Sequence, residues 1–159
     1  TSKALAQATG ACGAGILYRI ADAFLKRKVN IESLTVSEIE AQSMSRFTVV
    51  VKTDQIHIER IVKQLYKIIE VVKVLEKSDA ELITREIALI KVFIKTVEDK
   101  QKIESIIHLS GAVIDSFSED TIIFEKYGTE DEIDSLYRMV KSFGIREFAR
   151  SGRIAVTKE

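Results

Sequence analysis

Residues 30–52 read NIESLTVSEIEAQSMSRFTVVVK, and this stretch decides the fold. Its first part, 30–38, is rich in β-branched residues and lacks a helical period, which favours a β-strand. Its last part, 46–52, favours a second strand. The residues expected to share one face of that second strand are Phe47, Val49 and Val51. Two strands therefore follow one another with no helix between them.

Helical patterns flank this pair of strands. Before it, apolar residues recur at helical spacing over 16–26, and glycines at 10, 13 and 15 predict a turn into that helix. After it, Asp54 is a good N-cap for a second helix, and 71–75 favours another strand. With a weak strand at 3–9, the first half of the chain reads βαββαβ.

The second half repeats this order. The expected elements are a strand at 86–94, a helix opened by Thr96, a hairpin of 112–117 with 121–126, a helix opened by the capping box of Thr129 and Glu132, and strands at 145–149 and 154–156. We therefore predict an α+β protein of two tandem ferredoxin-like βαββαβ domains, residues 1–77 and 78–159. Units of this size bury only ~60% of the surface that the unfolded chain exposes. They also carry open sheet edges, so we expect dimerisation or a large partner.

The composition narrows the class of protein. The 159 residues include 24 Lys and Arg and 24 Asp and Glu, and zero net charge argues against binding nucleic acid through bulk electrostatics. No apolar run approaches the ~20 residues that a membrane span needs, and the first residues lack a signal-peptide layout. The single cysteine, Cys12, excludes a disulfide framework and a multi-cysteine metal site, and it fits a reducing cytoplasm.

No set of residues predicts catalysis or a metal site. His57 and His108 fall in predicted helices without ligand spacing, and Cys12 has no matched base. Residues 10–15, GACGAG, reverse the order of the dinucleotide fingerprint, and no Walker lysine follows. A glycine-rich turn at a helix N-terminus can hold a small anion such as a carboxylate, and a plain flexible turn is the alternative.

Five stretches resemble the small regulatory subunits of acetolactate synthase, also called acetohydroxyacid synthase. They are residues 30–36, 45–49, 63–74, 85–91 and 149–155, and the resemblance runs in order from about Gly15 to the end. It implies that the first domain is an ACT domain and that the chain is not an enzyme. It also implies that the chain binds and activates the catalytic subunit and gives it feedback control by valine, or another branched-chain amino acid, in branched-chain amino-acid biosynthesis. Thiamine diphosphate, Mg²⁺ and FAD are then expected on the catalytic partner and no cofactor on this chain.

The resemblance also implies an effector site at a homodimer interface, between the turn before the first helix of one chain and the second-strand region of its partner. Gly15, Leu17 and Asn30 match the family motif. The N–H groups of Ile16 and Leu17 would take the carboxylate of valine. Asn30 would bind both polar groups of the effector, and Ile31 would contact its aliphatic side chain.

This chain departs from the family motif near that site. Ala11 and Cys12 stand where the family has Glu and Asn, Ala14 replaces Pro or Ser, and Lys28 replaces a usual Gly. Loss of one charge-assisted hydrogen bond costs ~1.5–3 kcal/mol, roughly tenfold to a hundredfold in affinity. The resemblance therefore supports activation of the partner more directly than it supports feedback by valine.

Two other functions fit the same order of elements. One is a stand-alone amino-acid sensor of the ACT class. The other is an RNA-binding protein of the RRM type, which needs exposed aromatic residues in a sheet strand, and residues 46–50 lack that motif.

Overall fold

A computed structural model describes residues 2–11, 13, 15–40 and 43–158. The chain forms two compact units, one of residues 1–84 with 153–159 and the other of residues 85–152. Each unit contains an antiparallel sheet with two helices, which confirms the predicted α+β class and the βαββαβ order.

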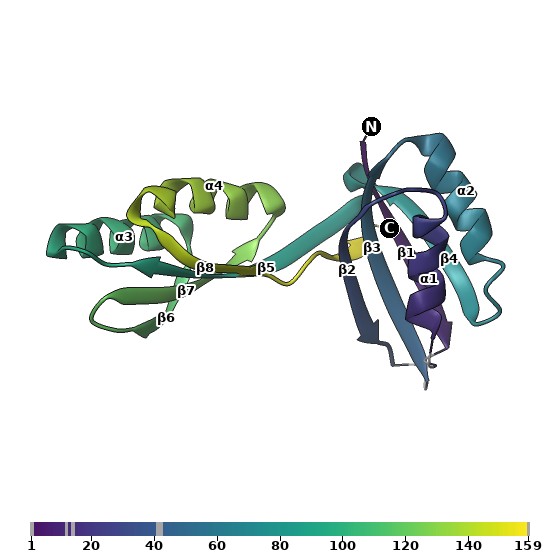
Figure 1. Ribbon diagram of the computed structural model, residues 1–159, viewed down its shortest axis with the longest axis horizontal. Helices are drawn as coiled ribbons and strands as arrows, with labels where there is room; N and C mark the ends of the chain where they lie inside the picture. The colour runs from purple at the N-terminus through teal and green to yellow at the C-terminus, as the bar shows by residue number, and fades with distance from the viewer. Residues whose placement is uncertain (1, 12, 14, 41–42, 159) are drawn as a thin grey trace. The chain divides into compact units, whose positions relative to one another are not determined.

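The first unit has a four-stranded sheet in the order β2-β3-β1-β4 (Figure 1). Its elements are β1 (Ser2–Ala11), α1 (Ile16–Leu25), β2 (Ile31–Glu38), β3 (Met44–Thr53), α2 (Gln55–Leu65), β4 (Val71–Ser78), the short 3₁₀ helix η1 (Asp79–Glu81) and β9 (Ile154–Thr157). The weak strand expected at 3–9 is a central strand, because β1 pairs with both β3 and β4. Its small residues Ala6 and Ala8 are buried beneath the helices.

The core of the first unit lies between the sheet and its two helices. Phe47, Val49 and Val51 share the buried face of β3, as their alternation predicts. Phe24 of α1 and Ile61 of α2 are fully buried against the same core.

The opposite face of this sheet carries a smaller buried cluster. It consists of Leu5, Val50, Leu82 and Ala155. Gln7 Nε2 donates to the backbone oxygen of Ala155 at 2.8 Å, and Thr35 Oγ1 donates to that of Arg153 at 3.2 Å. The C-terminal residues therefore pack on the first unit.

The structure divides the chain differently from the expected boundary between 77 and 78. The first unit continues to Thr84, and the chain returns to it with residues 153–159 after the second unit ends. The physical reason is that Leu82, at the start of β5, and Ala155 of β9 bury apolar surface on the first sheet.

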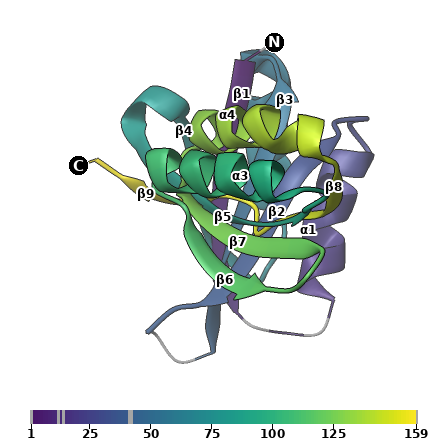
Figure 2. The same cartoon turned by 90° about the vertical axis from the view of Figure 1, so that its left-hand side faces the viewer.

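The second unit has a sheet in the order β6-β7-β5-β8. Its elements are β5 (Leu82–Phe93), α3 (Val97–Ser110), β6 (Val113–Phe117), β7 (Thr121–Gly128), α4 (Glu130–Val140), the 3₁₀ helix η2 (Lys141–Phe143) and β8 (Ile145–Arg150). Figure 2 shows α3 and α4 side by side over one face of this sheet. The hairpin predicted around Glu119 and Asp120 is confirmed as β6 and β7. The strand expected at 154–156 is β9, and it pairs with β5.

Three helices begin with the side-chain caps that the sequence predicts. Asp54 accepts from the N–H of His57, Thr96 accepts from the N–H of Asp99, and Thr129 forms a complete capping box with Glu132. These caps satisfy N–H groups that lack partners within the helix.

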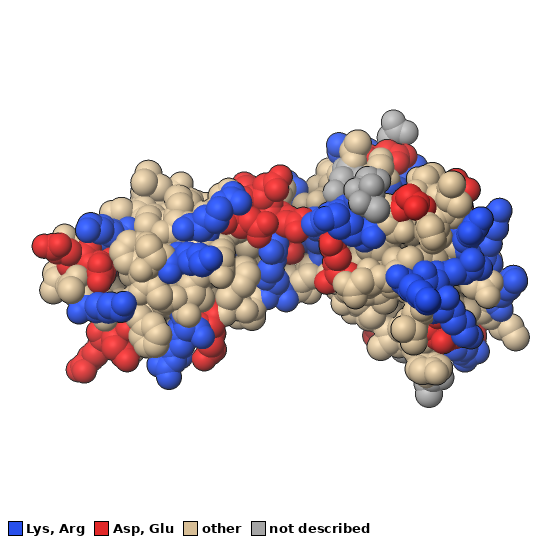
Figure 3. Space-filling model, turned by 45° about the horizontal axis from the view of Figure 1, so that its top comes forward, with Lys and Arg blue, Asp and Glu red and all other residues tan. Residues whose placement is uncertain are grey.

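Both signs of charge are spread over the surface. On the face drawn in Figure 3, acidic and basic side chains are interspersed over both units. No helix in the described part of the chain is long and apolar enough to span a membrane.

Glu81 in η1 provides a pH prediction. Hydrogen bonds from Lys77 Nζ and from the N–H and O–H of Ser78 lower the pKa of its carboxyl to about 2. A lowered pKa in the folded state stabilises the fold above the ordinary value of 4.5, and this contribution is lost as pH falls from 4.5 towards 2. An NMR titration should find the lowered midpoint, and Ser78→Ala should raise it. Ser105→Ala, in α3, is the control and should leave the midpoint of Glu81 unchanged. If Ser78→Ala has the same midpoint as the unsubstituted chain, the hydrogen bonds from Ser78 do not lower the pKa of Glu81.

Candidate effector site

The turn before α1 leaves the N-terminus of that helix without a side-chain cap. Gly15 is the N-cap residue with φ of 90°, and no side chain among the described residues accepts from the first turn. Ile16 N–H donates to the backbone oxygen of Gly13 across a long 3.4 Å, and Arg19 N–H donates to that of Gly15 at 3.1 Å. The first turn of α1 also contains no acidic residue.

This arrangement differs from the other three α-helices, which all have side-chain caps. The helix dipole and the N–H groups of the first turn both favour an anion. Ile16 itself is buried in the core, and Leu17 is exposed. The backbone of Ile16 and Leu17 can therefore serve an anion at this helix end.

An ion pair that the sequence analysis missed lies beside this turn. Arg19 Nη2 contacts Glu70 Oε1 at 2.5 Å, and the Ala11 N–H donates to the backbone oxygen of Glu70 at 3.0 Å. The second carboxylate oxygen of Glu70 is buried without a partner in the part of the chain that the structure describes. The sequence gives no signal of this ion pair, because Arg19 and Glu70 are far apart along the chain.

Gly10 allows β1 and the start of β4 to approach closely at this place. A Cβ atom on Gly10 would lie 2.5 Å from the backbone oxygen of Glu70 and 3.0 Å from Ile16 Cδ1. The register of β1 with β4 shifts between Thr9 and Gly10. This glycine is therefore explained by packing and needs no phosphate-binding role.

Asn30 and Ile31 lie at the other end of α1. Asn30 is exposed just before β2, and Ile31 begins β2 and packs partly on the core. The ten residues of α1 separate them from Gly15, a length of about 15 Å. The structure of one chain therefore does not bring the predicted effector residues together. Cys12 and Ala14 lie outside the described residues.

Lys28 occupies a backbone conformation that favours glycine. Its φ is 55°, and the Lys28 N–H and Val29 N–H donate to the backbone oxygens of Leu25 and Phe24. These bonds are those of a Schellman motif, whose left-handed position is most often Gly. Lys28 thus stands where the family usually has Gly.

Replacing Lys28 with glycine should stabilise the first unit by about 1 kcal/mol, because glycine avoids the steric cost of positive φ. Arg27→Gly is the matched control, since Arg27 lies one residue earlier and does not have positive φ. Urea denaturation should show the midpoint rising for Lys28→Gly and falling or unchanged for Arg27→Gly. A lower midpoint for Lys28→Gly would contradict the explanation.

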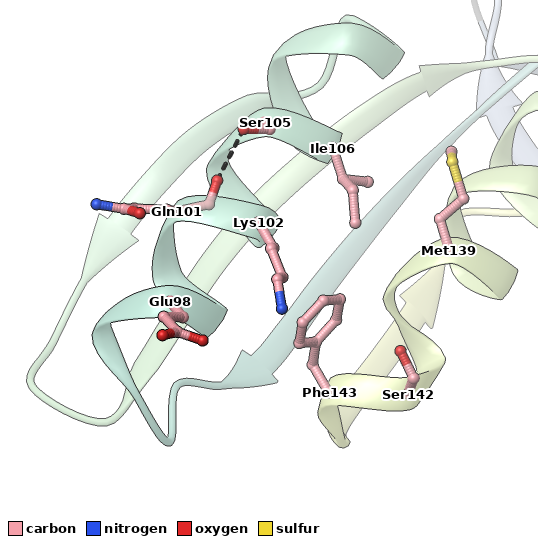
Figure 4. A pocket seen from close by; sticks show the side chains of 8 residues that line it. All are labelled: Glu98, Gln101, Lys102, Ser105, Ile106, Met139, Ser142 and Phe143. Atoms are coloured by element: carbon pink, nitrogen blue, oxygen red, sulfur yellow. Dashed lines mark hydrogen bonds between the residues drawn. The ribbon is translucent and has the colours of Figure 1, made fainter.

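A separate shallow groove of about 510 Å³ lies in the second unit, between α3 and the end of α4. Figure 4 shows Lys102 and Phe143 pointing towards one another across it. None of the predicted effector residues lines this groove. Across the residues that the structure describes, no group of three His, Cys, Asp or Glu side chains is placed to hold a metal ion.

Two family descriptions match most of the chain. Residues 13–73 match the "AHAS small subunit-like ACT domain", and residues 85–159 match the "Small subunit of acetolactate synthase". The first unit thus contains an ACT domain, and its βαββαβ fold agrees with that class.

Known proteins agree with these matches. The acetolactate synthase small subunit of Mycobacterium bovis is 38% identical over 144 residues, which cover 91% of this chain and 85% of that protein. That of Aquifex aeolicus is 37% identical over 145 residues, which cover 91% and 76%. The crystal structure of the small subunit from Thermotoga maritima has a TM-score of 0.91 and 32% identity, and it covers 100% of this chain and 99% of its own.

This chain belongs to the family of acetolactate synthase small subunits. The resemblance of the five sequence stretches is confirmed. The RRM interpretation needs exposed aromatic residues in the strand at 46–50, and Phe47 of β3 is instead buried beneath the helices.

Proposed function

We propose that this chain is the non-catalytic regulatory subunit of an acetolactate synthase in the cytoplasm. It binds the catalytic subunit, raises its activity and makes it responsive to valine or another branched-chain amino acid. Membership of the small-subunit family supports the role. Thiamine diphosphate, Mg²⁺ and FAD belong to the catalytic subunit in this proposal, and this chain contributes regulation alone.

The proposed effector site is completed by a second copy of the chain. Strand β2 is an edge of the first sheet, so its outer backbone groups are free to pair with another strand. The last residues of β1 and β2 both lie opposite the beginning of β3, near the turn that starts α1. If two β2 strands pair antiparallel, the start of one β2 lies beside the end of the other.

This pairing brings Asn30 of the partner subunit to the turn before α1. Within one chain, Asn30 and Gly15 lie at opposite ends of α1 and cannot bind one effector together. This observation carries the proposal, because in a dimer Asn30 of the partner subunit can lie beside Gly15. The effector carboxylate binds the N–H groups of Ile16 and Leu17 in place of the long bond to Gly13. The partner's Asn30 donates to that carboxylate and accepts from the ammonium group.

Two further groups fit an amino acid at this place. The partner's Ile31 provides apolar contact for an aliphatic side chain. The unpartnered oxygen of Glu70 is an acceptor that an ammonium group would satisfy. No nucleic acid or membrane takes part in the proposed function.

The mechanism is linkage between binding and assembly. An effector bound across the dimer favours one arrangement of the two ACT domains, and the catalytic partner has different affinity or activity in that arrangement. A coupling of ~1–3 kcal/mol is sufficient for a several-fold to a hundredfold response.

The test combines the purified chain with its cognate catalytic subunit and measures pyruvate condensation with and without valine. Stimulation by the chain supports the regulatory role, and its absence would end that proposal. A stand-alone sensor would bind valine but would not retain the catalytic subunit in a pull-down. Calorimetry with valine, leucine and isoleucine then identifies the effector.

Asn30→Ala locates the site. It should weaken effector binding by roughly tenfold to a hundredfold, because one charge-assisted hydrogen bond is lost. Stimulation in the absence of effector should persist. Gln101→Ala removes an exposed amide from α3 and should leave the isotherm unchanged. If Asn30→Ala binds the effector as tightly as the unsubstituted chain, the effector site does not include Asn30.

A further inference from the structure

The C-terminal residues of the chain lie on the face of the first sheet that turns away from α1 and α2. We call residues 153–158 the C-terminal strap; it contains β9 and belongs to the first unit. Ala155 is buried in the small apolar cluster on that face of the sheet. Its neighbours Ile154 and Val156 are 58% and 54% exposed. The strap therefore packs on the sheet through one side and faces solvent with the other.

Two side chains of the sheet hold the strap. Gln7 Nε2, in β1, donates to the backbone oxygen of Ala155 at 2.8 Å, and Thr35 Oγ1, in β2, donates to that of Arg153 at 3.2 Å. Gln7 is 6% exposed, so its amide would lose a buried partner if the strap left. Strand β3 lies between β1 and β2. The strap is therefore bonded to two strands that are not neighbours in the sheet.

The same two strands lead to the groups of the proposed effector site. Strand β1 runs into the turn before α1, where the N–H groups of Ile16 and Leu17 are proposed to bind the carboxylate. Strand β2 begins directly after Asn30, which is proposed to serve the effector site of the partner subunit. Effector binding and attachment of the strap therefore restrain the same pair of strands.

The apolar anchor of the strap is small. Ala155 carries a single methyl group, which buries little apolar surface. Ser33 lies on the same face of β2 as Thr35, and its hydroxyl oxygen is buried without a partner in the part of the chain that the structure describes. An unsatisfied buried hydroxyl costs free energy, and segments with few buried apolar contacts open locally more easily than the whole fold. The strap can therefore detach while the first unit stays folded.

We propose that effector binding and attachment of the C-terminal strap are coupled. The effector stabilises the attached strap, and the attached strap raises the affinity for the effector. This inference rests on the proposed function, because it concerns the regulation of the same effector site. A coupling between two binding events is reciprocal, so each event strengthens the other by the same factor.

The physical reason for the coupling is a shared cost of ordering. An effector bound between the turn and Asn30 fixes the end of β1 and the start of β2. The strap fixes the same strands further along, through Gln7 and Thr35. Whichever of the two binds second finds these strands already ordered and loses less conformational entropy. The coupling is therefore positive, and it needs no contact between the strap and the effector.

The strap also connects the effector site to the second unit through the chain itself. The chain passes between the two units twice, at residues 84–85 and at residues 152–153, and the strap begins at the second passage. While the strap is attached, both connections are fixed to the first sheet. When the strap is released, only the first connection is fixed. Release of the strap therefore gives the second unit more freedom of movement.

Hydrogen exchange of the full chain tests the coupling, with and without a saturating mixture of valine, leucine and isoleucine. The N–H groups of residues 153–158 should exchange about fivefold or more slowly when the amino acids are present. Strand β7, in the interior of the second sheet, is the internal control and should exchange at an unchanged rate. Calorimetry with each amino acid establishes which of the three binds the unsubstituted chain.

A matched pair of variants tests the reciprocal effect. Ala155→Glu places a carboxylate in the apolar cluster, so the strap should detach, residues 153–158 should exchange at least tenfold faster, and the effector should bind about fivefold or more weakly. Val156→Glu introduces the same side chain one residue later, at an exposed position, and should change neither quantity. Slow exchange of β3 shows that the first unit of each variant is folded.

A milder variant keeps the apolar cluster intact. Thr35→Val removes the hydroxyl that donates to the backbone oxygen of Arg153 but keeps the shape of the side chain. Loss of one hydrogen bond should speed exchange of residues 153–158 about fivefold and weaken effector binding in the same direction as Ala155→Glu. This variant decides the question if Ala155→Glu does not fold.

The possible failures are distinguishable. If one of the three amino acids binds but the exchange of residues 153–158 is unchanged, the coupling is wrong and the effector site stands. The coupling is also wrong if a folded variant with a detached strap binds the effector as tightly as the unsubstituted chain. If none of the three amino acids binds the unsubstituted chain, the proposed effector site and the coupling are overturned together.

Discussion

Replacing Phe24 with alanine is expected to lower the free energy of unfolding of the first unit by about 3–5 kcal/mol. Phe24 is fully buried near the end of α1 and packs in the core between the helices and the sheet. Removing the ring loses its transfer free energy and leaves a cavity that a packed core closes only partly. The change is a large part of the stability of a small unit.

The neighbouring residue provides the control for this prediction. Leu25 follows Phe24 in the same helix and is 74% exposed. Leu25→Ala should change the stability by less than about 0.5 kcal/mol, because exposed substitutions remove little buried surface. Denaturation followed by hydrogen exchange should locate the loss in the first unit. Similar effects for the two variants would mean that α1 is packed differently.

Replacing Arg150 with alanine is expected to cost the second unit about 3 kcal/mol, because it removes one partner of a buried ion pair. The Arg150 guanidinium contacts Glu86, whose side chain is 5% exposed, and its Nη1 lies 2.9 Å from Asp134 Oδ1. Burial opposes the charge on Arg150, but the hydrogen bonds and charges of Glu86 and Asp134 outweigh it and raise the pKa of Arg150. Without Arg150, the Glu86 carboxylate is left buried and unpaired.

A double variant separates this explanation from a simple loss of packing. Glu86→Leu with Arg150→Met replaces the ion pair by apolar groups and should recover most of the stability that Arg150→Ala loses. Thermal unfolding of the second unit measures the stability of Arg150→Ala and of the double variant. If the double variant is as unstable as Arg150→Ala, the cost does not come from an unpaired Glu86.

Local patterns were sufficient to predict most of the elements. Asp54 and Thr129 cap their helices as predicted, since a cap depends on residues three positions apart. The alternation of Phe47, Val49 and Val51 predicted their common buried face, because strand geometry alone dictates it. The candidate effector residues came from the family resemblance, and their roles stay predictions.

Features that depend on distant residues were not predictable in this way. β1 has few large apolar residues and reads as a weak strand, yet it is central because β3 and β4 pair on both sides of it. The residues next to Arg150 and Arg153 in the sequence give no signal that either side chain has a buried environment. In the fold, Arg150 contacts buried Glu86, and Arg153 is itself buried.

The amino-acid sequence by itself determined the α+β class, the order of helices and strands, the helix caps and the family. The tertiary structure alone decided that the C-terminal strand returns to the first unit and that Asn30 and Gly15 lie at opposite ends of α1. The reason is physical. Turns, caps and amphipathic faces arise from residues close together in the chain, whereas burial and pairing between distant segments depend on which surfaces meet after the chain has folded.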